Sequence, residues 1–223
     1  MRRIVSLMLA LCVSIVALNA QSQKEITKER RQIAKLSKSE LNEKASKDAR
    51  KEAKSLERDG WEVAPGHLPL EKQLDRSYMM QLEYDENLFP KYIMGDAMSI
   101  GENYDAAKMQ AMELAKQDLA GKIQQEVTAL VENSVHNKQL ASEEAASITE
   151  TITASKNLIS QNIGRVIPVV ECFRVKSNKN KEVRVVIIYN AEMAKVAAKN
   201  AVREELAQKG EKLHEQLDQV LGF

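Results

Sequence analysis

One stretch of the sequence, from Asn103 to Val131, has the regular apolar spacing of a long amphipathic helix. Apolar side chains recur there mostly at intervals of three and four residues, as one face of an α-helix requires. They are Ala107, Ala111, Leu114, Ala115, Leu119, Ile123, Val127, Leu130 and Val131. Asn103 or Asp105 is expected to cap the first turn, because a short polar side chain can accept hydrogen bonds from its free N–H groups. Such a face must be buried against another layer of secondary structure.

Three segments near this helix have the composition of β-strands. Tyr92–Ala97 precedes it, and Gly95 within this segment indicates a bulge or a close approach of another backbone. Ile163–Val175 and Glu182–Tyr189 are rich in Val and Ile, and the polar stretch between them predicts an antiparallel hairpin with a loop of about four to five residues. Pro168 indicates an edge strand or a bulge. The sequence therefore predicts an α+β fold, in which a small antiparallel sheet packs against the Ala-rich helix in two layers.

The face of the helix that should meet this sheet is predicted in detail. Leu114, Leu119, Ile123 and Val127 are expected to pack on the sheet, against the strands around Met94, Val169 and Val185.

Further helices are expected on both sides of this core. Leu70–Glu83 has an apolar residue at every fourth position, and a helix beginning at Ser142 has a stripe that reaches Ile159. Ala191–Leu221 is expected to be helical, with a kink at Gly210. We expect its charged half after Lys209 to project beyond the domain and the helix itself to pack against the N-terminal arm.

The first residues have the layout of a secretory signal peptide. Two arginines precede the apolar run Ile4–Leu18, and the sequence becomes polar after Ala20, where cleavage is expected. The run is shorter than the roughly 20 residues of a membrane span, although an uncleaved N-terminal anchor is the alternative. Lipid attachment at Cys12 is not expected, because Leu11 before it is large and the apolar run continues after it.

The segment that follows is a charged helical arm. Lys24–Asp59 holds 12 basic and 8 acidic residues, and its narrow apolar stripe is mostly alanine. Gly60 is expected to end the helix, as glycine does after a helix C-terminus. We interpret the arm as a solvated helix, and the alternative is a basic arm that lies on an anionic envelope surface.

These features divide the chain into five parts. They are a signal peptide over 1–20, a charged arm over 21–59, a connecting segment with a short helix over 60–90, a compact α+β domain over 91–190 and a C-terminal helix over 191–223.

Composition and motifs argue against several classes of function. With 33 basic and 32 acidic residues, the chain lacks the bulk positive charge of a nucleic-acid binder. His67, His136 and His214 have no metal-ligand spacing, and no nucleotide-binding or nucleophile-elbow motif occurs. We therefore expect no cofactor, no metal site and no enzymatic activity. Cys172, within a Val-rich strand, is expected to be a buried small hydrophobe.

The candidate partner-binding residues are Trp61, Val63, Leu68 and Leu70. They flank a Pro-Gly turn and form an apolar loop with little secondary structure of its own. Such a loop either offers an apolar patch to a partner or folds back on the domain. In the second case Trp61, the single Trp of the chain, would staple the arm to the domain.

The strand Tyr92–Ala97, the run Ala106–Ala120 with its Ala-x-x-x-Ala-x-x-x-Leu-Ala pattern, and the Val-rich segments Val166–Val170 and Val183–Tyr189 resemble the LPP-twenty family of small bacterial envelope lipoproteins. Similar domains occur in a flagellar outer-ring assembly protein. The resemblance covers about Tyr92–Asn190, under half of the chain. It implies a helix packed on a small antiparallel sheet, with no catalytic residue, while the acyl anchor of the family has no counterpart here.

We therefore expect an exported, non-enzymatic envelope protein, periplasmic or outer-membrane associated in a Gram-negative bacterium. Its expected role is protein binding or structural assembly, with an envelope protein partner or self-association through the long helices, and any membrane association would be peripheral. The alternative is a small-ligand or cell-wall-glycan binding module that uses Trp61, Tyr78 and Tyr92 as stacking surfaces. A hydrolase is a third hypothesis, which would need Asp96 in a pocket beside a histidine.

Overall fold

The computed structural model describes residues 43–86, 88–136 and 141–209, together with six single residues, Lys28, Arg31, Leu213, Glu215, Leu217 and Asp218. The expected signal peptide and most of the arm lie outside the described residues. The chain forms two units, Met1–Lys44 and Ala45–Phe223, and the fold given below is that of the second unit.

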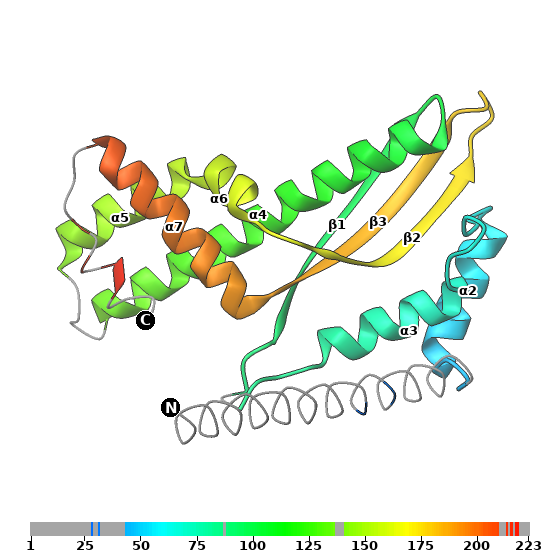
Figure 1. Cartoon of the computed structure of the whole chain (residues 1–223), viewed down its shortest axis with the longest axis horizontal. Helices are drawn as coiled ribbons and strands as arrows, with labels where there is room; N and C mark the ends of the chain where they lie inside the picture. The colour runs from blue at the N-terminus through cyan, green and yellow to red at the C-terminus, as the bar shows by residue number, and fades with distance from the viewer. Residues whose placement is uncertain are drawn as a thin grey trace, which may run out of the picture. The chain divides into compact units, whose positions relative to one another are not determined.

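The centre of this unit is a three-stranded antiparallel sheet (Figure 1). It consists of β1 (Tyr92–Gly101), β2 (Ile167–Val175) and β3 (Lys181–Asn190), in the order β1-β3-β2. Residues 176–180 connect β2 to β3, as the sequence predicted. Pro168 lies on an edge strand, and the register also shifts between Pro168 and Val170, so both of the features that this proline indicated are present.

The long helix α4 (Tyr104–His136) covers one face of the sheet. The Asn103 side chain accepts a hydrogen bond from the N–H of Ala106 at 2.9 Å, which confirms the predicted cap. A Cβ atom on Gly95 would lie 2.2 Å from the carbonyl oxygen of Ala115. The predicted close approach of another backbone at Gly95 is therefore confirmed, and it allows α4 to lie directly on β1. The α+β class and the packing of the Ala-rich helix on a small sheet are confirmed.

The prediction that Leu114 packs on this sheet is wrong. Leu119, Ile123 and Val127 are buried in the core, whereas Leu114 is 38% exposed. The contact stripe runs through Ala111 and Ala115, and neighbouring residues on a helix point about 100° apart. Leu114 therefore lies beside the stripe rather than on it.

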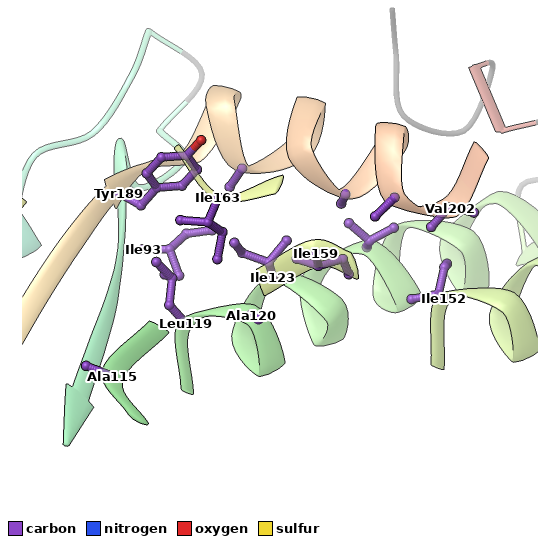
Figure 2. Packing of buried hydrophobic residues seen from close by; sticks show 14 of the residues in the cluster. Ile93, Ala115, Leu119, Ala120, Ile123, Ile152, Ile159, Ile163, Tyr189 and Val202 are labelled. Carbon is purple, nitrogen blue, oxygen red and sulfur yellow. The ribbon is translucent and has the colours of Figure 1, made fainter. Parts of the chain in front are cut away.

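The second half of α4 packs on α5 (Ser142–Ala154), α6 (Lys156–Asn162) and α7 (Ala191–Lys209) beyond the sheet. Figure 2 shows Ile152, Ile159 and Val202 from these three helices gathered over the residues of α4. The expected stripe from Ser142 to Ile159 is present, but the helix is interrupted at Ser155. The Ser155 hydroxyl is buried and donates a hydrogen bond to the carbonyl oxygen of Thr151 at 2.7 Å.

Two expectations for the C-terminal helix are wrong. It packs on α4, α5 and α6, while the described part of the arm packs elsewhere. Of the segment after Lys209, the described residues Leu217 and Asp218 do not project, since Leu217 is fully buried in the same core and Asp218 forms ion pairs with Lys199 and Arg203 of α7. The kink expected at Gly210 lies outside the described residues. The stripe alanines Ala194, Ala198 and Ala201 of α7 are buried in this core.

The other face of the sheet is covered by α2 (Lys47–Arg58) and α3 (Leu70–Gln81). The core on this face contains Val169, Val170, Cys172, Val186 and Ile188 of the strands. Ala49 and Ala53 of α2, Leu70 and Leu74 of α3, and Ala45 and Trp61 beside α2 pack with them. Gly60, with φ of +84°, follows α2 as predicted. The expected burial of Cys172 is confirmed, and burial raises the pKa of its thiol to about 12. The sheet therefore has a helical layer on each side, and α2 and α3 add a third layer to the two that the sequence predicted.

Candidate functional site

The connecting segment that holds the four predicted partner-binding residues is attached to the outer edge of β2. The N–H and C=O of Glu62 bond the C=O and N–H of Phe173 at 2.7 and 2.8 Å. Beside this bridge the Arg174 guanidinium lies 4.8 Å from the centre of the Trp61 ring, a cation–π contact. The segment thus extends the sheet by a single residue.

The structure buries this segment rather than exposing it. Trp61 is 5% exposed and Leu70 is equally buried, while Val63 and Leu68 are half-buried. This burial supports the alternative in which Trp61 staples the arm to the domain. The partner-binding role of these residues stays a prediction, and their burial does not favour it.

A polar cluster lies next to this segment, around the buried carboxylate of Glu171 on β2. Lys108 Nζ lies 2.7 Å and His67 Nε2 3.3 Å from Glu171 Oε1, and the Tyr104 hydroxyl donates a hydrogen bond to the same oxygen. The Glu171 N–H donates to Gln73 Oε1 at 2.6 Å. The cluster therefore joins α3, α4, β2 and the connecting segment.

The charge of Glu171 is fixed by these partners. Burial by itself would raise the pKa of its carboxyl, but the hydrogen bonds from Lys108 and Tyr104, with the charges of Lys108 and His67, hold the pKa below its ordinary value. Burial and the carboxylate together raise the pKa of the Tyr104 hydroxyl. A general acid or base needs a pKa near the working pH. Glu171 is ionised and ion-paired, so a structural role in joining these elements fits it better than a role in proton transfer.

Sequence reasoning missed this cluster because its members are far apart in the chain. The one available signal is Glu171 itself, a carboxylate between Val170 and Cys172 in an otherwise apolar strand. A buried carboxylate needs hydrogen-bonding and cationic partners, but the sequence does not say which residues supply them.

Asp96, the acid singled out for the hydrolase hypothesis, pairs with a cation. Its carboxylate Oδ2 lies 2.8 Å from Arg184 Nη2 of the neighbouring strand β3. The partner of Asp96 is thus a guanidinium rather than the histidine which that hypothesis required.

The three rings of the glycan-binding alternative belong to the core between the sheet and α2 and α3. Trp61 is buried there, and Tyr78 and Tyr92 pack partly buried against the same cluster. The Tyr78 hydroxyl donates a hydrogen bond to Glu52 of α2. The rings therefore make contacts within the protein, and their placement gives the stacking alternative no support.

A group of exposed large apolar side chains lies at the end of α3 and in the segment between α3 and β1. We call this set the hairpin surface; it consists of Met79, Leu82, Tyr84, Leu88 and Phe89. Leu88 is 81% and Phe89 65% exposed. Single exposed apolar residues are ordinary, but several in one short segment are not.

Backbone hydrogen bonds give this segment a defined shape. Tyr84 and Pro90 form an isolated antiparallel bridge. The N–H of Asp85 donates to the carbonyl oxygen of Phe89 at 2.8 Å, and that of Lys91 donates to Glu83 at 2.9 Å. Leu88 has a φ of +64°, a conformation that is costly for a residue with a large side chain. The fold thus holds an apolar pair outward in a strained turn.

A hollow of about 270 Å³ lies where α6 and α7 meet. It is open to solvent and is lined by Asn162, Tyr189, Glu192, Met193, Val196, Ala197 and Asn200. Pockets for small ligands are usually about 300–1,000 Å³ and enclose most of the ligand, so this hollow is a weak candidate for such a site.

Within the described ranges, no three side chains of His, Cys, Asp or Glu are grouped so that they could hold a metal ion. The helices of the same ranges include none that is long and apolar enough to cross a membrane. Comparison of the chain with protein-family models, curated proteins and solved structures finds no match.

Proposed function

We propose that this chain is an exported, non-enzymatic protein of the bacterial cell envelope that binds another protein through the hairpin surface. The observation that carries the proposal is the exposure of five large apolar side chains within residues 79–89. Their exposure to water is unfavourable, since burial of one Leu or Phe side chain contributes about 1.5–3 kcal/mol of favourable free energy. A protein partner that covers Leu88 and Phe89 would recover this free energy.

The charges around the hairpin surface favour a protein over an anionic membrane. Glu83, Asp85 and Glu86 lie in the same segment as Leu88 and Phe89, with Lys91 as the neighbouring cation, 3.9 Å from Glu83. An anionic lipid surface would repel this acidic segment. We therefore propose a partner whose apolar recess is bordered by Lys or Arg side chains.

Export, the envelope location and the absence of enzymatic activity are supported by the sequence. The N-terminal layout favours a cleaved signal peptide, and the resemblance to the LPP-twenty family fits an envelope protein without catalytic residues. Self-association through the long helices is less well supported. The apolar stripe of α7 is already buried against α4, α5 and α6.

The proposal is tested by placing a photo-reactive side chain at Leu88 in cells and purifying the cross-linked protein. Binding of the purified partner is then measured by calorimetry with native chain and with Leu88→Asp. We expect at least ten-fold weaker binding for Leu88→Asp, because a charge would enter the apolar recess. Met109→Asp is the control, since Met109 is also highly exposed but lies on α4. Equal affinities for native chain and Leu88→Asp would refute the proposal.

A further inference from the structure

The two edges of the sheet are protected unequally. An edge strand has free N–H and C=O groups with which another strand can pair, and proteins usually cover them. On the outer edge of β2, Glu62 bonds both backbone groups of Phe173, and Gln73 bonds the N–H of Glu171. This edge is therefore occupied along the part that faces the connecting segment.

The first half of β1 is protected by two side chains of α4. Asp118 Oδ2 accepts a hydrogen bond from the N–H of Asp96 at 3.1 Å, and Lys122 Nζ donates one to the carbonyl oxygen of Met94 at 2.9 Å. Asp118 and Lys122 are also 2.8 Å apart as an ion pair. They occupy the positions that a neighbouring strand would use.

The second half of β1 lacks this protection. In an antiparallel pair, alternate residues direct their N–H and C=O groups to the same side. Since Met94 and Asp96 direct theirs outward, Met98 and Ile100 do so too. No side chain in the described part of the molecule bonds these groups of Met98 or Ile100. Their own side chains are 55% and 50% exposed.

The exposed Leu114 lies along the same edge. Gln110 accepts a hydrogen bond from the Ser99 hydroxyl at 2.9 Å, and Asp118 accepts one from the N–H of Asp96. Residues four apart on a helix share a face, so Leu114 lies between these two contacts. A strand added to β1 would cover Leu114 on one face of the sheet and Met98 with Ile100 on the other.

We propose that the second half of β1, over residues 97–101, accepts a short extended segment of a partner protein as a fourth strand. Free backbone groups at two-residue spacing would supply the hydrogen bonds, and the apolar side chains on both faces would supply the contact area. Glu102, which follows β1 directly, and Glu113, which precedes Leu114, are exposed, and Asp118 borders the edge. The segment should therefore have apolar side chains at its centre and basic residues at its ends.

A second copy of this chain fits less well than a partner segment. Antiparallel pairing of β1 with itself about Met98 would set Asp96 opposite Ile100 of the other copy. That pairing needs the N–H of Asp96, which Asp118 already holds. The site is also separate from the hairpin surface and does not depend on it.

The test uses the synthetic peptide Lys-Val-Thr-Val-Thr-Val-Lys as the probe and the full chain labelled with nitrogen-15. We expect millimolar peptide to slow amide hydrogen exchange at Met98 and Ile100 at least ten-fold, and to shift the resonances of residues 97–101 and Leu114. Met98→Lys should weaken binding at least ten-fold, since an edge lysine opposes strand addition. Met109→Lys is the matched control and should leave binding unchanged.

A proline variant separates strand addition from simple apolar contact. Met98→Pro removes an N–H that points away from β3, which an edge strand tolerates, so the circular dichroism spectrum should be retained while peptide binding is lost. The proposal would be overturned if the peptide did not slow amide hydrogen exchange at Met98 and Ile100. It would also be overturned if both variants, Met98→Pro and Met98→Lys, bound the peptide as tightly as the native chain. Leu88→Asp should bind the peptide normally, and loss of binding in that variant would assign the peptide to the hairpin surface instead.

Discussion

The two faces of the sheet are covered by helices in different ways. On the α4 face, small residues bring backbones together. Cβ atoms on Gly95 and Gly101 would lie 2.2 Å from the Ala115 carbonyl oxygen and 2.8 Å from the Ala107 nitrogen. The fit of this face therefore depends on the absence of side-chain atoms at particular positions.

On the α2 and α3 face, long side chains connect α3 to α2 and the connecting segment to β2. The Trp61 ring lies against Arg174, and the Tyr78 hydroxyl bonds a carboxylate on α2. These contacts depend on side-chain reach and on polar groups that find partners. A substitution that adds atoms should therefore destabilise the packing on the α4 face. A substitution that removes side-chain atoms should have its largest effect on the α2 and α3 face.

The largest expected effect is on the second face, from Trp61→Ala. Removal of a buried Trp side chain costs about 3–5 kcal/mol, and here it also removes the cation–π contact with Arg174. Urea unfolding followed by circular dichroism should show this loss. In the native chain, Trp61 fluorescence should be blue-shifted and should move to the red on unfolding. A change below about 1 kcal/mol would show that this layer adds little to stability.

Leu119→Ala tests the first face by removing atoms. Leu119 is fully buried in the α4 core, so the variant should lose about 2–5 kcal/mol in urea unfolding. Leu114→Ala changes the same residue type earlier in the same helix, at a partly exposed position, and should lose much less. Equal midpoints for the two variants would mean that the contact face of α4 is assigned wrongly.

Gly95→Ala tests the same face by adding one methyl group. The new Cβ would meet backbone atoms of α4, so α4 or β1 would have to shift at a cost of about 1–3 kcal/mol. Gly164→Ala is the control, because its Cβ would meet only the Tyr189 hydroxyl oxygen, at an ordinary contact distance of 3.7 Å. If both variants unfold at the same urea concentration, the close approach at Gly95 does not limit stability.

The sequence predicted the α4 face far better than the other face. Apolar periodicity predicted α4, Gly95 predicted its close contact with another backbone, and Pro168 predicted that β2 is an edge strand with a bulge. Each of these signals lies within a few neighbouring residues of the sequence. The prediction for Leu114 was wrong because the stripe of nine apolar residues is wider than the part of α4 that touches the sheet.

The other face depends on which elements meet, and a single sequence does not contain that information. The alanines of α2 were recognised as a stripe, but their partner is the sheet with α3. Of the candidate site, the sequence identified Trp61 and its loop and offered both outcomes, a partner-binding loop and a buried staple, and the burial of Trp61 supports the second. It missed the hairpin surface because exposure of Leu88 and Phe89 follows from a turn whose backbone bonds are not visible in composition.

Glu171 contacts residues from both sides of the sheet, Lys108 of α4 and Gln73 of α3. Its ionisation should make the stability of the fold depend on pH. Its partners hold the pKa of the carboxyl below the ordinary value of 4.5 despite burial. The folded protein thus binds fewer protons than the unfolded chain near that pH, and stability present at neutral pH is lost as the pH falls through and below 4.5. In Glu171→Gln the free energy of unfolding should change less steeply over this range.

The measurement for Glu171 is a series of urea titrations between neutral and acidic pH. The Glu171→Gln variant should retain part of the native slope, because the pKa values of the Asp75, Glu182 and Asp218 carboxyls are also lowered. Parallel curves for native chain and Glu171→Gln would exclude Glu171 as a source of the pH dependence.

The smallest expected effect concerns the ion pair between Asp96 and Arg184. Both side chains are partly exposed, and exposed ion pairs are usually worth about 0–1 kcal/mol because water and salt screen them. Asp96→Asn should therefore lower the free energy of unfolding by at most about 1 kcal/mol, and the difference should shrink as salt is added. Glu192→Gln, in a more exposed pair on α7, is the control and should change less. A loss of several kcal/mol for Asp96→Asn would mean that this ion pair between β1 and β3 is screened by water far less than its exposure indicates.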